Sequence, residues 1–556
     1  MMNRWIKSGA PWVWLNAAAV STSIVLVCGL LLLIAIRGLG HFWPADVTEF
    51  SYVDKNNQQV RIIGEVTDEE TVPLRRLQDA GITLAEGRLD ASAQRVQRLL
   101  VKTGNRDVLG LDFQWLLVPN IDKQSTPEAL VTVERYEWGN FYGYLKSVKA
   151  DGKVIDAKEA LWAELEQQLD RAAELHSQIR KIEKDDIGTI NYQLERLRLR
   201  QKKLELQGDW NTQNQQELAQ EKQQAEAEYG HLQKALNKLY SDINRDSITM
   251  ETASGQAVDI PLAKVVNVYK ANEMSVLSKI GFYIHKVWEF LTDDPREANT
   301  EGGIFPAIFG TVLMVIIMSI IVTPFGVIAA VYLREYATQG FLTRLIRIAV
   351  NNLAGVPSIV YGVFGLGFFV YFLGGNLDRL FFPEALPAPT FGTPGIMWAS
   401  LTLALLTLPV VIVATEEGLS RIPKSIREGS LALGATKAET LWRTVLPMAS
   451  PAMMTGLILA VARAAGEVAP LMLVGVVKLA PSLALDANAP FLHLDRKFMH
   501  LGFHIYDVGF QSPNVEAARP LVYATALLLV VVIVVLNMAA VAVRNQLREK
   551  YRALEG

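Results

Sequence analysis

The sequence predicts a mainly α membrane protein with six transmembrane helices and a large external α+β domain, into which a helical hairpin is inserted. Three observations support this fold class. The 556 residues have a mean hydropathy of +0.20, yet 20% are charged, so membrane spans must coexist with a sizeable polar domain. Long apolar runs lie near the N-terminus and after residue 300. Between them, strand-like alternation surrounds a stretch rich in Glu, Gln, Lys and Leu.

Composition also limits the partners and the covalent stabilisation of the chain. The formal net charge of -3 is close to neutral and gives no argument for nucleic-acid binding, so we expect no nucleic-acid partner. Cys28 is the single cysteine and lies inside an apolar run. An intrachain disulfide is therefore impossible, and an exported domain must be stabilised by packing alone.

The first apolar run covers residues 14–36 and follows Arg4 and Lys7. At about 23 residues it is long enough to span a bilayer, and it is longer than the core of a signal peptide. We therefore expect an uncleaved first helix within residues 1–37. Its N-terminal end is expected in the cytoplasm, because basic residues stay on that side.

Residues 38–300 contain no spanning run and are predicted to form a periplasmic domain. Alternation at residues 50–54 and 59–66 predicts strands, and strand patterns resume at 247–256 and 265–272. Apolar residues at helical spacing within residues 157–244 predict an inserted helical hairpin with a coiled-coil-like seam. Its best turn is at 207–209, and residues 185–188 are either a kink or a second turn.

The remaining spans are expected at about 302–333, 348–373, 396–414, 447–477 and 521–543, followed by a cytoplasmic tail at 544–556. Together, residues 301–543 form the predicted transmembrane domain. Basic residues concentrate before the third and fifth spans and in the tail. With six spans, all three basic regions fall on the cytoplasmic side, as the positive-inside rule requires.

A basic, helix-forming segment at residues 421–447 passes directly into the fifth apolar segment. It follows the pattern E-A-A-x₃-G-x₉-I-x-L-P, although Gly429, Ser430 and Thr444 replace the two alanines and the isoleucine. This pattern is the cytoplasmic coupling loop of ABC-importer permeases, and the stretch resembles one. The residues that the resemblance assigns to an ATPase-coupling loop are Glu428, Gly434, Ala435, Leu446 and Pro447.

The second to sixth spans resemble the permease subunits of the phosphate ABC importer. The resemblance rests on GGIFPAIFGTVLMVI, PFGVIAAVYLREYA, NNLAGVPSIVYGVFG and ARAAGEVAPLMLVG. Of the two permease types in that system, PstA and PstC, the RAAGEVAPL segment looks more like PstA. The resemblance is loose over residues 14–37. Residues 38–300 depart from the compact family pattern, so the chain resembles a large-periplasmic-loop variant.

The resemblance implies six helices of ABC-importer permease type in the inner membrane, surrounded by lipid. It implies a heterodimer with a PstC-type permease, two copies of a cytoplasmic ATPase, and a periplasmic phosphate-binding protein. No G-x-x-x-x-G-K-[ST] motif occurs, so we expect a transport subunit rather than an enzyme. No cofactor is expected in this chain, and ATP and Mg²⁺ would be bound by the partner ATPase.

Arg463 and Glu467 are four residues apart in the fifth apolar segment, which would place both on one helical face. Such residues are costly in a membrane unless they pair or face a water-filled path. One interpretation is a structural ion pair. The other is a translocation path in which Arg463 attracts phosphate with two parallel donors and Glu467 accepts a hydrogen bond from protonated phosphate. Pro357 and Ser358 either line the same path at a helix break or form a packing kink.

Other interpretations remain open from the sequence. His500 and His504 have a spacing that a metal site could use, with His493 nearby, but no convincing further ligand completes it, so no metal is expected. The permease could import another oxyanion, such as molybdate or sulfate. Alternatively, the chain could be an envelope scaffold or sensor that acts through its coiled-coil periplasmic domain.

Overall fold

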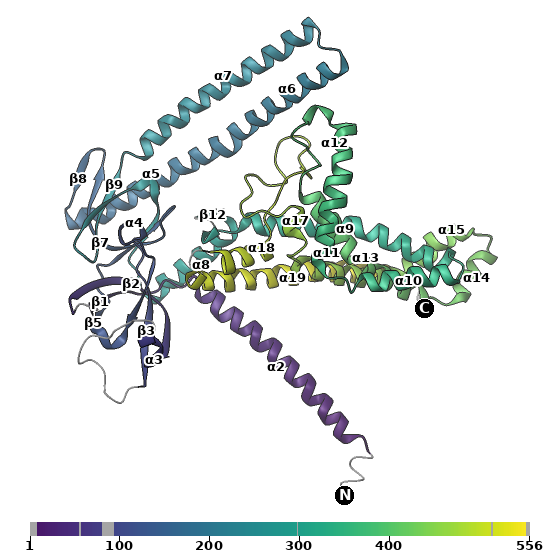
Figure 1. Cartoon of the computed structure of the whole chain (residues 1–556), viewed down its shortest axis with the longest axis horizontal. Helices are drawn as coiled ribbons and strands as arrows, with labels where there is room; N and C mark the ends of the chain where they lie inside the picture. The colour runs from purple at the N-terminus through teal and green to yellow at the C-terminus, as the bar shows by residue number, and fades with distance from the viewer. Residues whose placement is uncertain (1–7, 55–56, 80–93, 297–298, 513–514, 552–556) are drawn as a thin grey trace. The chain divides into compact units, whose positions relative to one another are not determined.

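The computed structural model describes residues 8–54, 57–79, 94–296, 299–512 and 515–551 and divides into two compact units (Figure 1). The helical unit comprises Met1–His41 and Ile304–Gly556. The inserted unit comprises Phe42–Gly303. Each unit has its own core.

In the part of the chain that the structure describes, six helices are long and apolar enough to cross a membrane, which confirms the expected number. The spanning stretches are Pro11–Gly40, Phe305–Tyr336, Ser358–Phe381, Ile396–Arg421, Lys437–Gly466 and Ala518–Glu549. They contain α2 (Ala10–Gly40), α9 (Phe305–Val331), α11 (Ser358–Phe364), α12 (Gly375–Phe381), α13 (Ile396–Arg421), α15 (Lys437–Thr440), α16 (Leu446–Gly466) and α19 (Val515–Tyr551).

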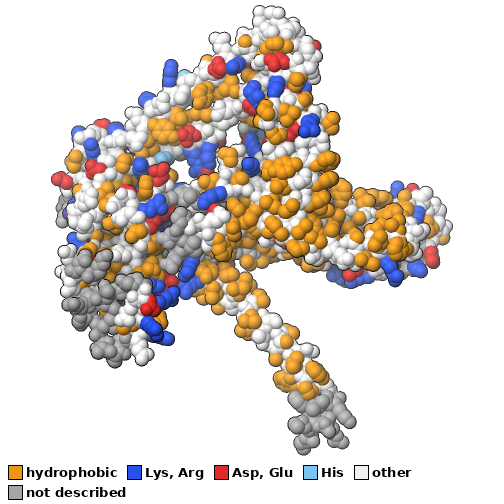
Figure 2. All heavy atoms as spheres, in the orientation of Figure 1, with side chains coloured by type: hydrophobic (Ala, Val, Ile, Leu, Met, Phe, Trp, Pro, Cys, Tyr) orange, Lys and Arg blue, Asp and Glu red, His pale blue; other side chains and the backbone are white. Residues whose placement is uncertain are grey.

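Helix α13 is the most buried of these helices and packs against both α9 and α16. Small residues allow the close approach: a Cβ on Gly418 would lie 2.5 Å from Cβ of Ala452, and one on Gly456 would lie 2.6 Å from Cβ of Ala414. Helix α2 instead exposes apolar side chains along its length, and Figure 2 shows mainly hydrophobic side chains on it. Such a surface is suited to lipid.

The third span begins later than the sequence prediction placed it. Residues expected at its start belong to a separate amphipathic helix, α10 (Phe341–Leu353), and the spanning helix starts at Ser358. Pro357 lies immediately before that helix, with φ -55° and ψ 135°, rather than inside it. Because a proline disfavours helical geometry at the residue before it, the chain must leave α10 before it enters the span.

The fifth span ends earlier than expected, at Gly466 instead of about residue 477. Glu467 already has extended geometry, with φ -80° and ψ 131°, and a separate short helix, α17, covers Leu471–Val474. Pro470 explains the break, because it has no N–H to donate to the carbonyl of Gly466.

The inserted unit contains two main antiparallel sheets, in the orders β4-β3-β2-β1-β5 and β10-β9-β7-β6-β11, with β8 paired to β7. The first sheet comprises β1 (Val47–Val53), β2 (Gln59–Pro73), β3 (Arg95–Lys102), β4 (Phe113–Leu117) and β5 (Ile121–Ser125). The second comprises β6 (Val131–Arg135), β7 (Phe141–Ala150), β8 (Lys153–Ile155), β9 (Ser247–Glu251), β10 (Ala257–Pro261) and β11 (Val265–Tyr269). Short elements are α3 (Leu74–Asp79), α4 (Arg106–Leu109) and the pair β12 (Pro295–Arg296) and β13 (Glu301–Gly302).

A long helical hairpin separates β8 from β9 in the chain (Figure 1). One arm consists of α5 (Lys158–Lys181), a π-helical turn at Ile182–Asp186 and α6 (Ile187–Gln207), and the other is α7 (Thr212–Ile243). Residues 185–188 therefore do not form a second turn. Gly208 ends α6 with φ +78°, a conformation that glycine adopts without strain, and the chain reverses there.

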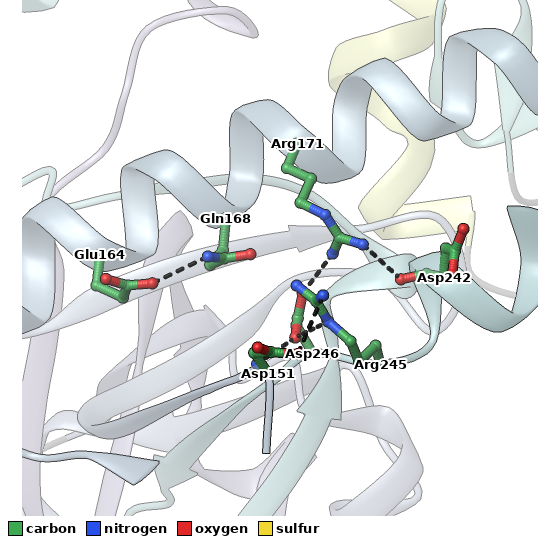
Figure 3. Close-up of polar contacts among 7 residues, drawn as sticks. All are labelled: Asp151, Glu164, Gln168, Arg171, Asp242, Arg245 and Asp246. Atoms are coloured by element: carbon green, nitrogen blue, oxygen red, sulfur yellow. Dashed lines mark hydrogen bonds and ion pairs between the residues drawn. The ribbon is translucent and has the colours of Figure 1, made fainter. Parts of the chain in front are cut away.

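Asp246 anchors the base of the hairpin to the β-rich body (Figure 3). Its carboxylate is buried and lies 2.5 Å from Nη1 of Arg171 on α5 and 2.9 Å from Nε of Arg245. It also accepts a hydrogen bond of 2.9 Å from the backbone N–H of Asp151. Burial raises the pKa of Asp246, but Arg245, the Asp151 N–H and Arg171 outweigh it, and the net pKa is lowered.

The substitution Asp246→Asn is expected to loosen the base of the hairpin at neutral pH. Asp246 is a buried carboxylate that accepts several charge-assisted hydrogen bonds, and the substitution removes its charge. The stabilising free energy of these contacts should fall by about 2 kcal/mol. Hydrogen–deuterium exchange of the full chain at fixed pH measures the effect as faster exchange at the base of α5 and α7. Asp151→Asn is the control, because that side chain is exposed and its contact with Arg245 is 3.3 Å.

The same anchor is expected to weaken in acid. Because folding lowers the pKa of Asp246 from its ordinary value of 3.8, its contribution is present above about pH 4 and is lost as the pH falls through the folded-state value. Limited proteolysis of the hairpin should therefore accelerate below about pH 4. The acceleration should be smaller in Asp246→Asn; equal acceleration in both proteins would show that other groups control the acid response.

Candidate functional site

The segment that joins α13 to the fifth span folds into two short helical stretches around a glycine turn. The first is α14 (Lys424–Ala432), whose Ile426 packs against a buried cluster containing Leu419 and Leu441. Gly434 follows with φ +88° and no neighbouring atom within 4 Å of a Cβ placed there, so the backbone conformation rather than space requires glycine. Thr436 then begins α15 with a reciprocal capping box to Glu439.

The second stretch does not stop before Pro447. α15 continues through a π-helical turn at Leu441–Val445 directly into α16, where Leu446 and Pro447 occupy the first turn. The proline has no N–H to donate, and it lies just after the wider π-helical turn, where the regular hydrogen-bond ladder is already interrupted. The loop and the fifth span are thus one helical element from Lys437 to Gly466.

Polar contacts attach this loop to the end of the second span. Arg427 lies 2.7 Å from the carboxylate of Glu335 and donates to the carbonyls of Ile422 and Leu419 at 2.7 and 2.9 Å. Lys437 donates to the carbonyl of Glu335 at 2.5 Å. Residues 92 positions apart are therefore joined, and a displacement of the loop would be transmitted to α9 as well as to α13 and α16. Sequence reasoning did not identify Arg427 or Glu335.

A second ion pair fixes α10 to α13 near the same end of the unit. Arg347 lies 3.0 Å from Glu416 and donates to the carbonyl of Leu333 at 3.1 Å. The sequence analysis did not predict this pairing, because nothing in either local pattern specifies a partner 69 residues away.

The loop exposes large apolar side chains at and near its tip. Leu433, next to Gly434 at the tip, is 91% exposed, and Trp442, in the π-helical turn that leads into α16, is 73% exposed. Glu428 on α14 is also exposed. Figure 2 shows charged side chains gathered around the same α14–α15 end. An apolar tip with a charged surround is typical of a protein-docking surface.

Arg463 and Glu467 lie together at the end of α16 rather than on one continuous helical face. Arg463 is in the last turn, where the helix dipole favours a cation, and Glu467 is the first residue beyond the helix. Nε of Arg463 is 3.6 Å from Oε1 of Glu467, and their side chains are 34% and 21% exposed. The pair is loose and partly accessible, so both groups retain capacity for another polar partner.

The third span approaches this pair. Tyr361 of α11 lies within electrostatic range of Arg463, and its hydroxyl donates to the carbonyl of Leu353 at 2.6 Å. A Cβ on Gly362 would lie 2.7 Å from Cα of Pro470, so α11 packs closely on the segment just after Glu467. Ser358 is one turn before Gly362 and is partly exposed, while Pro357 is exposed. The sequence analysis named Ser358 and Pro357 as candidate path-lining residues but missed Tyr361. Its position near Arg463 depends on how the helices pack, which the local sequence does not specify.

The histidines considered as metal ligands, His493, His500 and His504, have different surroundings. His493 Nε2 is 2.9 Å from Asp486 Oδ1, and His500 precedes α18 (Leu501–Tyr506), where its Nδ1 accepts from the N–H of Gly502 at 3.1 Å. His500 and His504 therefore do not share a regular helix. Among the described residues, no group of three or more His, Cys, Asp or Glu side chains could hold a metal ion.

Comparisons with known proteins agree on one class of protein. Residues 322–549 match the family described as "Binding-protein-dependent transport system inner membrane component". "Phosphate transport system permease protein PstA 1" of Mycobacterium tuberculosis is 33% identical over 287 residues, which cover 51% of this chain and 83% of the relative. The chain belongs to the PstA-type family of ABC transporter permeases.

Two further relatives and one solved structure also match this chain. "Probable ABC transporter permease protein YqgI" of Bacillus subtilis is 31% identical over 46% of this PstA-type permease and 81% of the relative. "Phosphate transport system permease protein PstC" of Mesorhizobium japonicum is 31% identical over 35% and 61% of the two chains. A solved MetNI methionine ABC transporter chain has 18% identity and a TM-score of 0.32, with 43% of this chain and 94% of that chain covered.

The PstA-type permease is thus a transport subunit rather than a catalytic enzyme, and within the residues that the structure describes six helices are fit to span a membrane.

Proposed function

We propose that this chain is the permease subunit of an ATP-driven importer of inorganic phosphate and forms half of the translocation path. The observation that carries the proposal is the 33% identity to a phosphate-transport permease over 83% of that relative's length. The partly accessible Arg463–Glu467 pair supplies the chemistry that such a substrate needs.

Arg463 would attract the phosphate, because a guanidinium presents two parallel donors that match two phosphate oxygens. Glu467 would balance the charge and accept a hydrogen bond from a protonated phosphate oxygen. Sulfate carries no proton near neutral pH and could not donate this bond. Tyr361 and Ser358 would line the path beside the pair, with Pro357 just before the helix that carries them.

The loop between α13 and α16 would couple transport to a separate ATPase that binds ATP and Mg²⁺. Leu433 at the exposed tip and Glu428 on α14 would dock on that subunit, while Gly434 and Ala435 form the turn. Leu446 and Pro447 would join the loop to the span. Since Arg427 and Lys437 attach the loop to residue 335, closure of the ATPase would move three spans together as a rigid body.

The working complex would contain a PstC-type permease, two ATPase copies and a periplasmic phosphate-binding protein. The chain would lie in the inner membrane with both termini in the cytoplasm, because basic residues flank the ends assigned to that side. The inserted unit would then lie in the periplasm, where its hairpin could contact the binding protein or another envelope component.

The test is uptake of radiolabelled phosphate at micromolar concentration by a host without its own PstA-type subunit. The host expresses this chain with its cognate partners. We expect uptake that depends on this chain and that excess molybdate or sulfate does not compete away. Competition by either anion would assign the permease to another oxyanion. An assembled complex without uptake would contradict the transport assignment.

A further inference from the structure

Helix α8 (Val276–Thr292) belongs to the inserted unit (Figure 1). An exposed apolar stripe runs along it. Leu277 is 80% and Trp288 is 64% exposed. With about 100° of rotation per residue, the exposed apolar residues occupy one continuous arc of the helix. They are Val276, Leu277, Ile280, Ile284 and Trp288.

The opposite side of α8 is fixed to the body of the unit. Phe290 is buried, and Phe282 packs on Tyr269 with ring centroids 4.6 Å apart. Lys286 lies 2.6 Å from Glu134, and Lys279 pairs with Asp46. The helix therefore cannot turn its apolar stripe inward without breaking these contacts, so the stripe requires a partner outside the unit.

Covalent connectivity limits where that partner can be. Phe42 and Trp43 follow the spanning helix α2, which ends at Gly40, by two and three residues. Both pack on α8: the rings of Phe42 and Phe290 are 5.0 Å apart, and those of Trp43 and Tyr283 are 6.1 Å apart. At its other end, α8 is separated from the spanning helix α9 by residues 293–304. One side of α8 is thus held at the point where the chain leaves a membrane span.

We infer that α8 is an interfacial helix whose apolar stripe inserts into the adjacent bilayer surface. Its 17 residues give an axis of about 25 Å, and its charged residues exclude it as a span. Apolar side chains on one arc and polar ones elsewhere are the pattern of helices that lie in the plane of a membrane interface. A tryptophan at the edge of the stripe suits the same environment.

The ion pairs of the two lysines of α8 indicate which lipids the helix would recognise. Both Lys279 and Lys286 are engaged with carboxylates of the unit and are largely buried. Little cationic charge is left to recognise anionic head groups, so insertion should depend on apolar burial. It should therefore occur in zwitterionic bilayers and be insensitive to salt.

The experiment uses the full chain in nanodiscs of zwitterionic phosphatidylcholine. With Cys28→Ala as background, an environment-sensitive fluorophore is attached to Ile284→Cys on the stripe or, as the matched control, to His285→Cys. The native side chain at 285 is exposed on the polar side of the same turn. Quenching by nitroxide-labelled lipid and by aqueous iodide is then compared at the two sites, at low and high salt.

We expect the label at 284 to be quenched severalfold more by the lipid nitroxide, and severalfold less by iodide, than the label at 285. Salt should not change this difference. Equal iodide quenching at both sites would overturn the proposal. Shielding of 284 from both quenchers would also overturn it, because the stripe would then be covered by protein. The same measurement with a label at Ile280→Cys, a second position of the stripe, tests whether the result is a local effect of one label.

Discussion

Replacing Arg463 with glutamine is expected to reduce phosphate uptake about 100-fold while the permease complex still assembles. A charge-assisted bidentate contact contributes about 3 kcal/mol, and each 1.4 kcal/mol is a factor of ten. Arg463→Lys keeps the charge without the planar fork of donors and should retain part of the activity. Initial rates of radiolabelled phosphate uptake at matched complex levels measure both effects.

Arg379→Gln is the control, since this arginine on α12 is exposed and belongs to another helix than the pair. A purely structural role for the Arg463–Glu467 pair makes a different prediction. Loss of the assembled complex in Arg463→Gln, with recovery of assembly and uptake when Glu467→Gln is added, would favour that role. Normal uptake in Arg463→Gln alone would exclude both roles.

The substitution Leu433→Ser is expected to weaken association with the ATPase about tenfold or more. Burying a leucine side chain at an interface contributes about 1.5–3 kcal/mol, and the serine would lose this contribution. Because Leu433 is 91% exposed in the chain by itself, the substitution should not destabilise the permease fold. Co-purification at increasing detergent-wash stringency, together with transport-coupled ATP hydrolysis, measures the loss.

Phe510→Ser is a matched control, because Phe510 is also a large apolar side chain that is mostly exposed, at 76%, and lies outside the loop at Asp507–Gln511. It should leave ATPase association unchanged. If Leu433→Ser retained full association and coupled hydrolysis, the tip of the loop would not be the docking surface.

The sequence predicted which segments cross the membrane better than where they end. Apolar runs of sufficient length identify a span without any tertiary information. The ends depend on local breaks: Pro357 and Pro470 displaced the boundaries of the third and fifth spans, although both prolines were visible in the sequence. The C-terminal part of the amphipathic helix α10, from about residue 348, was assigned to the span because its apolar residues are continuous with it.

Contacts between distant residues were not accessible from the sequence. The helix-turn-helix form of the loop follows from Gly434 and the Thr436–Glu439 capping box, which are local signals. The pairing of Arg427 with Glu335 and the approach of Tyr361 to Arg463 depend on how helices pack. The stripe on α8 was overlooked, although its apolar spacing of three and four residues is a readable helical signal.

The most direct measurement is phosphate accumulation by the purified complex reconstituted in proteoliposomes, with the phosphate-binding protein outside and ATP inside. We expect ATP-dependent accumulation of radiolabelled phosphate that is lost in Arg463→Gln and in Leu433→Ser but not in their controls. A complete complex that hydrolyses ATP in response to the loaded binding protein, yet accumulates no phosphate, would contradict the assignment of this chain as a phosphate permease.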